Sequence, residues 1–193
     1  MEQNSFFALV FRQKYIKRWG LMRNVQPENL SEHATEVAVI AHCLAVVGNR
    51  IFGKHYDEGQ ATLLALFHDV PEVYTGDLPT PIKYFDKDSR KSYDTVEKQA
   101  VSSLLSKIPE ELRPAYENLV GEPECPEKAL VKVADKLCAY IKCLEEEKCG
   151  NTEFRSAKEA IRQQLERLDC PELGWFTEHL LPTFSLTIDE MQM

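Results

Sequence analysis

Apolar residues recur at helical spacing along nearly the whole chain, and this periodicity constrains the fold more than any other feature. An α-helix turns once in about 3.6 residues, so apolar residues three and four positions apart share a face. No window of four or more residues alternates like a half-buried strand. The pattern predicts an all-α fold of six or more helices. The main expected helices cover about 5–17, 31–48, 57–68, 88–107, a segment after residue 126, and 152–168.

Residues that commonly begin or end helices mark several of these boundaries. Ser5 and Ser31 stand where N-capping residues are expected, and Gly48 is a natural stop. Pro109 and Pro126 are each expected in the first turn of a following helix, where a missing N–H costs least.

Length, charge and cysteines narrow the class of protein. The 193 residues suit one domain, which we expect to span 1–193. The net charge of −8 argues against partners with polyanionic surfaces, such as long nucleic acids or anionic membranes. Acidic Glu2 precedes the apolar run 6–11, so no targeting signal is expected, and no apolar run approaches a membrane span of about 20 residues. The six cysteines form no C-x-x-C pair, and we expect free thiols in the cytoplasm.

Four polar residues interrupt the expected apolar faces: His33, His68, Asp69 and Asp135. Burying a lone carboxylate costs several kcal/mol unless it is paired or binds a metal. Two imidazoles and two carboxylates would satisfy one another around a shared divalent cation, a donor set that suits Mn, Co, Fe, Ni or Zn. The alternative is that each histidine is an ordinary core residue and each aspartate a helix cap or salt-bridge partner.

The order of these residues, H…HD…D, resembles the signature of the HD-domain phosphohydrolases. The resemblance is closest to the bacterial YfbR-type 5'-deoxynucleotidases, and it runs essentially from end to end. It is carried by the stretches 17–24, 29–33, 68–73, 75–85, 134–140 and 182–186. It implies a single-domain HD-type helical bundle and a homodimer. It also implies one divalent cation, cobalt, manganese or another transition metal, held by His33, His68, Asp69 and Asp135.

A basic segment near the N-terminus stands out against the acidic average. No acidic residue lies between Glu2 and Glu28, and the five basic residues there are Arg12, Lys14, Lys17, Arg18 and Arg23. A solvated helix face would explain part of this charge. An arginine can also bind phosphate through two N–H groups, and an indole can pack beside a sugar or base. The resemblance places Arg18 at the substrate phosphate and Trp19 beside the nucleoside.

Glu72 follows His68 by one helical turn, so both side chains are expected on one side. A carboxylate there can accept a proton from the attacking water or deliver one to the leaving oxygen. The alternative is a surface glutamate in the short helical turn expected over 71–74.

The loop over 76–81 contains two prolines and cannot lie inside a helix. By resemblance it forms one side of the substrate pocket, and Asp77 accepts a hydrogen bond from a sugar hydroxyl. Asp77 as a plain turn residue is the alternative. Lys83 adds a nearby charge. The pocket residues implied are Asp77, Leu78, Pro79 and Thr80.

Together these features predict a metal-dependent phosphomonoesterase that converts deoxyribonucleoside 5'-monophosphates to deoxynucleoside and phosphate. Glu72 and Arg18 are the expected catalytic residues. One alternative is an HD hydrolase of another nucleotide, a deoxynucleoside triphosphate or a guanosine alarmone. The other is a non-catalytic helical module that binds a nucleotide.

Overall fold

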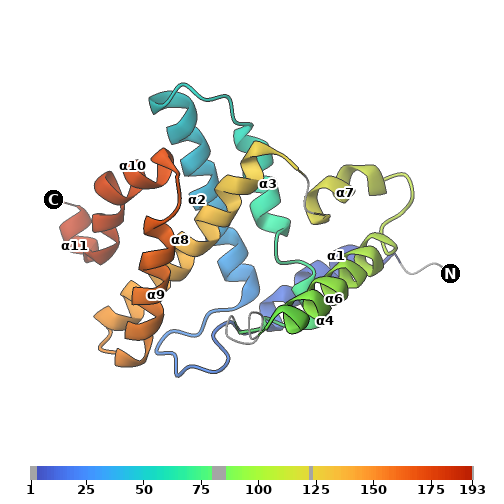
Figure 1. The fold of residues 1–193 in the computed structure, drawn as a ribbon, viewed down its shortest axis with the longest axis horizontal. Helices are drawn as coiled ribbons and strands as arrows, with labels where there is room; N and C mark the ends of the chain where they lie inside the picture. Colours follow the sequence, from blue (N-terminus) through green and yellow to red (C-terminus); the bar gives the residue numbers. More distant parts are fainter. Residues whose placement is uncertain (1–3, 80–85, 122–123, 193) are drawn as a thin grey trace. The chain divides into compact units, whose positions relative to one another are not determined.

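The computed structural model describes residues 4–79, 86–121 and 124–192, and these residues form helices and no strand (Figure 1). The all-α prediction is therefore confirmed. An isolated antiparallel bridge joins Lys17 and Asn29. The chain forms two compact units, which are described separately below. One domain over 1–193 stays a prediction.

The first unit comprises residues 1–23, 27–35 and 66–124. Its helices are α1 (Phe6–Val10), η1 (Phe11–Tyr15), α4 (Glu72–Thr75), α6 (Lys87–Leu105) and α7 (Arg113–Val120), together with the first residues of α2 and the last of α3. Its apolar core consists of Phe6, Val70, Leu104, Ile108 and Val120. Val70 anchors the 68–72 segment, which carries three of the candidate residues, in this core.

The second unit comprises residues 24–26, 36–65 and 125–193. It holds most of α2 (Leu30–Ile51) and α3 (Glu58–Phe67), then α8 (Pro126–Lys148), η2 (Thr152–Phe154), α9 (Arg155–Glu166), α10 (Pro171–His179), η3 (Leu181–Ser185) and α11 (Ile188–Met191). Helix α8 packs against α9 and η3. It buries the expected face of Leu130, Ala134, Leu137 and Ile141.

Both ends of α2 differ from the expected ones. Asn29, not Ser31, caps the helix: its Oδ1 accepts hydrogen bonds from the backbone N–H groups of Ser31 and Glu32 at 3.0 and 3.1 Å. Glu32 accepts the Asn29 N–H in return, which completes a capping box. The helix also continues past Gly48 to Ile51. A Cβ at Gly48 would lie 2.6 Å from the Tyr56 ring, so this glycine permits close packing and does not end the helix.

Two other boundary predictions need correction. The first helix ends at Val10, where the chain tightens into a 3-10 helix; Phe6 in the first helix is buried, whereas Phe11 in the 3-10 helix is 72% exposed. Pro109 begins a turn, because its carbonyl accepts two backbone N–H groups from residues 112 and 113. Pro114 is the proline in the first turn of α7, while Pro126 opens α8 as predicted.

Among the described helices, α2 is the one long and apolar enough by composition to cross a membrane. However, 56% of its apolar window is buried inside the protein, as in the core helix of a globular fold.

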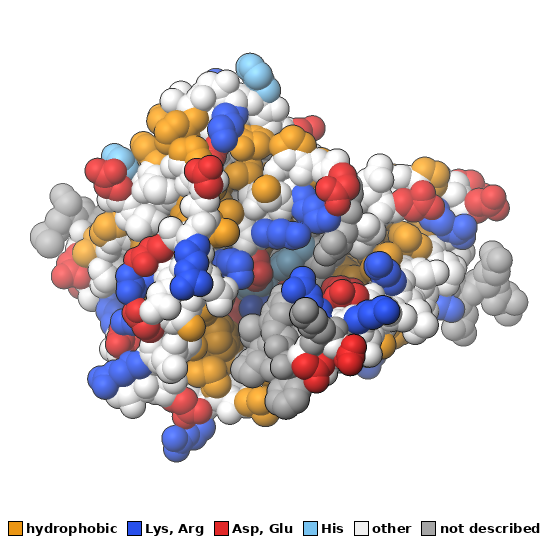
Figure 2. Space-filling model, viewed as in Figure 1, with side chains coloured by type: hydrophobic (Ala, Val, Ile, Leu, Met, Phe, Trp, Pro, Cys, Tyr) orange, Lys and Arg blue, Asp and Glu red, His pale blue; other side chains and the backbone are white. Residues whose placement is uncertain are grey.

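On the face shown in Figure 2, acidic and basic side chains are intermixed. The net charge of −8 is therefore not gathered into one acidic patch on that face.

Candidate active site

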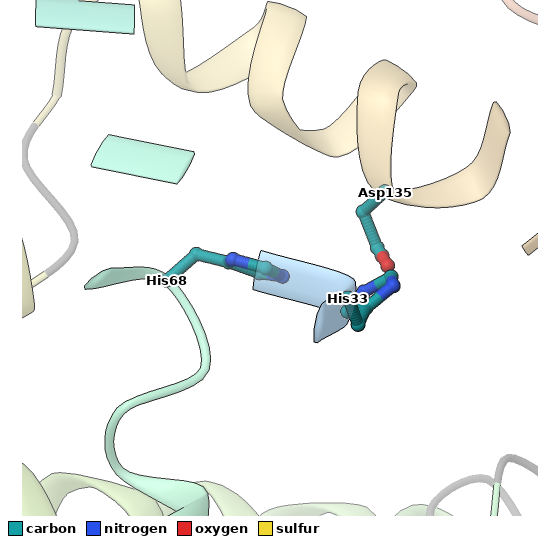
Figure 3. A group of neighbouring side chains, drawn as sticks. All are labelled: His33, His68 and Asp135. Atoms are coloured by element: carbon teal, nitrogen blue, oxygen red, sulfur yellow. The ribbon is translucent and has the colours of Figure 1, made fainter. Parts of the chain in front are cut away.

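Three of the predicted metal ligands meet in the first unit. His33 lies in the first turn of α2, and His68 and Asp69 lie in the turn that follows α3. The Asp69 Oδ2 atom is 3.1 Å from His68 Nε2 and 3.8 Å from His33 Nε2. The imidazole centroids are 5.6 Å apart, and His68 points toward His33 (Figure 3). Two imidazole nitrogens thus lie within 3.8 Å of one carboxylate oxygen, and all three atoms are suitable metal donors.

Arg18 lies beside this cluster. Its Nη1 is 3.5 Å from Asp69 Oδ2, and its Nε is 3.6 Å from Glu28 Oε2. Burial alone would raise the pKa of Asp69 and favour its neutral form. The charge and hydrogen bond of His68 oppose this most strongly, and the charges of His33 and Arg18 add to them. The pKa of Asp69 is therefore held below its ordinary value, which keeps this donor ionised.

Trp19 adopts a strained backbone conformation. Its φ of 57° lies in the left-handed region, which a bulky side chain rarely enters and which costs about 1–3 kcal/mol. Two backbone hydrogen bonds hold the flanking chain, from Arg18 N to Glu28 O at 3.0 Å and from Leu30 N to Ile16 O at 2.9 Å. Such strain persists where the surroundings enforce it, most often at functional sites. It supports the prediction that Trp19 has a binding role.

Glu28 belongs to the cluster, and the sequence reasoning missed it. The residue is 9% exposed, and its Oε1 lies 3.4 Å from His33 Nδ1. Burial raises its pKa, but the contact with His33 and the charge of Arg18 outweigh this, so the pKa of Glu28 lies below its ordinary value. A glutamate just before a helix is normally read as favouring the helix N-terminus. The sequence offered one signal for Glu28: it is the first acidic residue after the stretch 3–27, which contains none.

Glu72 is buried. It begins α4, is 4% exposed, and its backbone N–H donates to Asp69 O at 3.0 Å. The alternative of a surface glutamate is therefore wrong. Gly76, with φ of 73°, ends α4 as expected.

The predicted pocket loop follows Gly76. Asp77, Leu78 and Pro79 are half-buried. Thr80 and Lys83 lie outside the described residues.

Asp135 lies on α8 (Figure 3), in the second unit, and is half-buried. Its role as a fourth ligand stays a prediction. His42 is exposed, whereas His33 on the same helix is fully buried, in agreement with their separation of about 180° around the helix axis.

Comparison with known proteins places this chain in a family. The family model described as 5'-deoxynucleotidase YfbR-like matches residues 5–184. The chain is 47% identical to 5'-deoxynucleotidase YfbR of Escherichia coli and 46% identical to a 5'-deoxynucleotidase of Enterobacter sp. strain 638, over 99% of this chain and 97% of each relative.

Solved structures share the fold. An HD-domain phosphohydrolase from Listeria innocua superposes with a TM-score of 0.82 at 23% identity, covering 100% of this chain and 94% of that one. The HD phosphohydrolase of cyanophage S-2L, bound to dA and one catalytic Zn²⁺ ion, gives 0.68 at 21% identity over 91% and 96%. The chain has the HD-domain fold, belongs to the YfbR-like 5'-deoxynucleotidase family, and is a hydrolase.

Proposed function

We propose that this protein hydrolyses deoxyribonucleoside 5'-monophosphates to deoxynucleoside and phosphate, using one divalent cation. The observation that carries the proposal is the convergence of two imidazoles and a guanidinium on the Asp69 carboxylate. This arrangement occurs in a chain 47% identical to an E. coli 5'-deoxynucleotidase.

The donor set fits a transition metal. His33 and His68 present Nε2 atoms to the same oxygen of Asp69, and imidazole with carboxylate suits cobalt, manganese or zinc without a thiolate. Asp135, a further carboxylate on α8, is the proposed fourth ligand. When bound, the cation supplies a Lewis acid for a phosphate oxygen and lowers the pKa of a water molecule.

The remaining residues bind the substrate and move the proton. Arg18 binds the phosphate oxygens and stabilises the charge that develops there as the bond breaks. Water adds to phosphorus, the bond from phosphorus to O5' breaks, and O5' takes a proton. Buried Glu72 is the group proposed to accept the water proton and to protonate O5'.

Trp19 and the 77–80 loop are proposed to select the sugar. The Trp19 indole packs beside the nucleoside, and Asp77 accepts a hydrogen bond from the 3'-hydroxyl. Leu78, Pro79 and Thr80 complete that side of the pocket. Together they are proposed to leave no room for a 2'-hydroxyl.

Phosphate release by the purified protein tests the activity. We expect inorganic phosphate from dAMP with Mn²⁺ or Co²⁺, little from AMP, and none after chelation. Glu72→Ala and Asp135→Ala are each expected to remove most turnover. Release of pyrophosphate from a deoxynucleoside triphosphate or a guanosine alarmone would replace the proposal with another HD hydrolase. Silence on all nucleotides would favour a binding module.

We also infer a cytoplasmic homodimer. The family resemblance supports the dimer, and the six free thiols suit a reducing compartment. Light scattering should give twice the chain mass of 22.2 kDa, and a monomer at micromolar concentration would exclude the dimer.

A further inference from the structure

Glu28 holds three residues of the proposed active site at once. One carboxylate oxygen, Oε2, accepts a hydrogen bond from Trp19 Nε1 at 2.7 Å and lies 3.6 Å from Arg18 Nε. The other, Oε1, lies 3.4 Å from His33 Nδ1. The residue is 9% exposed, so these contacts are largely shielded from water.

The contact with His33 fixes which ring nitrogen is available as a donor. His33 Nδ1 faces Glu28, whereas His33 Nε2 faces Asp69 at 3.8 Å. A carboxylate on the far nitrogen of a metal-binding histidine sets the ring orientation and raises its basicity as a ligand. Glu28 is placed to do this for His33.

The contacts with Trp19 and Arg18 hold the strained turn. Trp19 has a φ of 57°, and the backbone on its N-terminal side is tied to Glu28 through the Arg18 N–H to Glu28 O bond of 3.0 Å. The Glu28 side chain also accepts the indole N–H. Backbone and side chain of one residue therefore fix both the phosphate-binding arginine and the tryptophan.

We propose that Glu28 is a positioning residue that couples the metal ligand His33 to the substrate-binding residues Arg18 and Trp19. This inference rests on the proposed function for the roles of those three residues. Because one carboxylate contacts both the metal ligand and the substrate-binding pair, its loss should weaken cation binding and substrate binding together. Proton transfer by Glu72 should remain.

Isothermal titration with Mn²⁺ alone, together with steady-state kinetics on dAMP, tests the coupling in Glu28→Gln. We expect the Mn²⁺ Kd to rise about 10–100-fold, the usual effect of losing such a partner, and the KM for dAMP to rise with it. Trp19→Phe removes the indole N–H and should raise KM while leaving the Mn²⁺ Kd unchanged. Glu127→Gln is the matched control: this glutamate on α8 is also buried, at 7% exposed, but its carboxylate accepts the Asp57 N–H, so both constants should stay at wild-type values.

Wild-type Kd and KM in folded Glu28→Gln would overturn the proposal, as would equal losses in the Glu127→Gln control. If circular dichroism shows that Glu28→Gln is unfolded, Glu28→Asp takes its place, since it keeps the charge and shortens the reach; unchanged constants in that variant would equally overturn it. The Mn²⁺ titration does not depend on turnover. A wild-type protein that binds Mn²⁺ without hydrolysing dAMP would therefore refute the proposed function, while the Kd of the Glu28 variants would still decide the coupling to His33.

Discussion

Replacing Glu146 with glutamine should be among the most destabilising single changes in the second unit. Glu146 lies on α8, is 1% exposed, and accepts hydrogen bonds from Lys142 Nζ at 2.6 Å and Asn151 Nδ2 at 2.7 Å. Its carboxylate also accepts the backbone N–H groups of Val25 and Gln26 at 2.9 and 3.0 Å. A glutamine side chain has only one acceptor oxygen, so its N–H₂ group would face some of these donors and leave them without an acceptor.

The size of the effect follows from the partner left behind. Lys142 is 5% exposed, so the substitution leaves a buried ammonium without its counter-charge. Removing one member of a buried ion pair costs about 3–5 kcal/mol. For a chain of this size each kcal/mol lowers the melting temperature by about 2–4 °C, so we expect a fall of roughly 6–20 °C.

The pH dependence of unfolding offers a second test of the same carboxylate. Burial opposes ionisation of Glu146, but the hydrogen bonds from Lys142, Val25, Asn151 and Gln26 outweigh it and lower its pKa from 4.5 to about 2. A carboxyl whose folded pKa is lowered stabilises the fold above its unfolded value. This stabilisation is therefore present above about pH 4.5 and is lost as the pH falls toward 2.

Thermal unfolding followed by circular dichroism between pH 7 and pH 3 measures both effects. Glu159→Gln is the matched control, because Glu159 also has a pKa lowered to about 2, through its hydrogen bonds with Arg162 and Gln163, but lies on the surface. We expect little change in that variant, since exposed ion pairs contribute little. If Glu146→Gln melts within about 2 °C of the wild type at pH 7, the reasoning from the buried ion pair is wrong.

Three further substitutions test other parts of the structure. Glu72→Gln should lower kcat about 10²–10⁴-fold with little change in the Mn²⁺ Kd; wild-type kcat would remove Glu72 from proton transfer. Gly48→Ala places a Cβ 2.6 Å from a tyrosine ring and should cost about 1–3 kcal/mol in thermal unfolding, whereas Gly174→Ala, with nothing within 4 Å, should not. His33→Ala should abolish Mn²⁺ binding in calorimetry, and His42→Ala, exposed on the same helix, should retain it; equal binding by both would exclude His33 as a ligand.

The helical elements were predictable because each buries a continuous apolar face. The spacing of Leu130, Ala134, Leu137 and Ile141 predicts α8, and all four are buried. The meeting of His33 with the 68–69 pair was predictable as well, since buried polar residues need partners. The family resemblance supplied the order of the ligands and the substrate class.

What sequence reasoning missed depends on contacts distant along the chain. Gly48 reads as a helix stop by propensity, but Tyr56 packs against it and the helix continues. The helical spacing of apolar residues does not single out Glu28, because its role comes from contacts with His33, Arg18 and Trp19. The left-handed conformation of Trp19 is equally invisible, since no glycine or asparagine marks it.

A crystal structure of the Glu72→Ala variant with Mn²⁺ and dAMP tests the central claim most directly, because the variant should bind substrate without turning it over. We predict one metal ion that contacts His33, His68, Asp69 and Asp135, with the phosphate between the metal and Arg18. A cation bound elsewhere, or dAMP bound with no metal at these residues, would contradict the account.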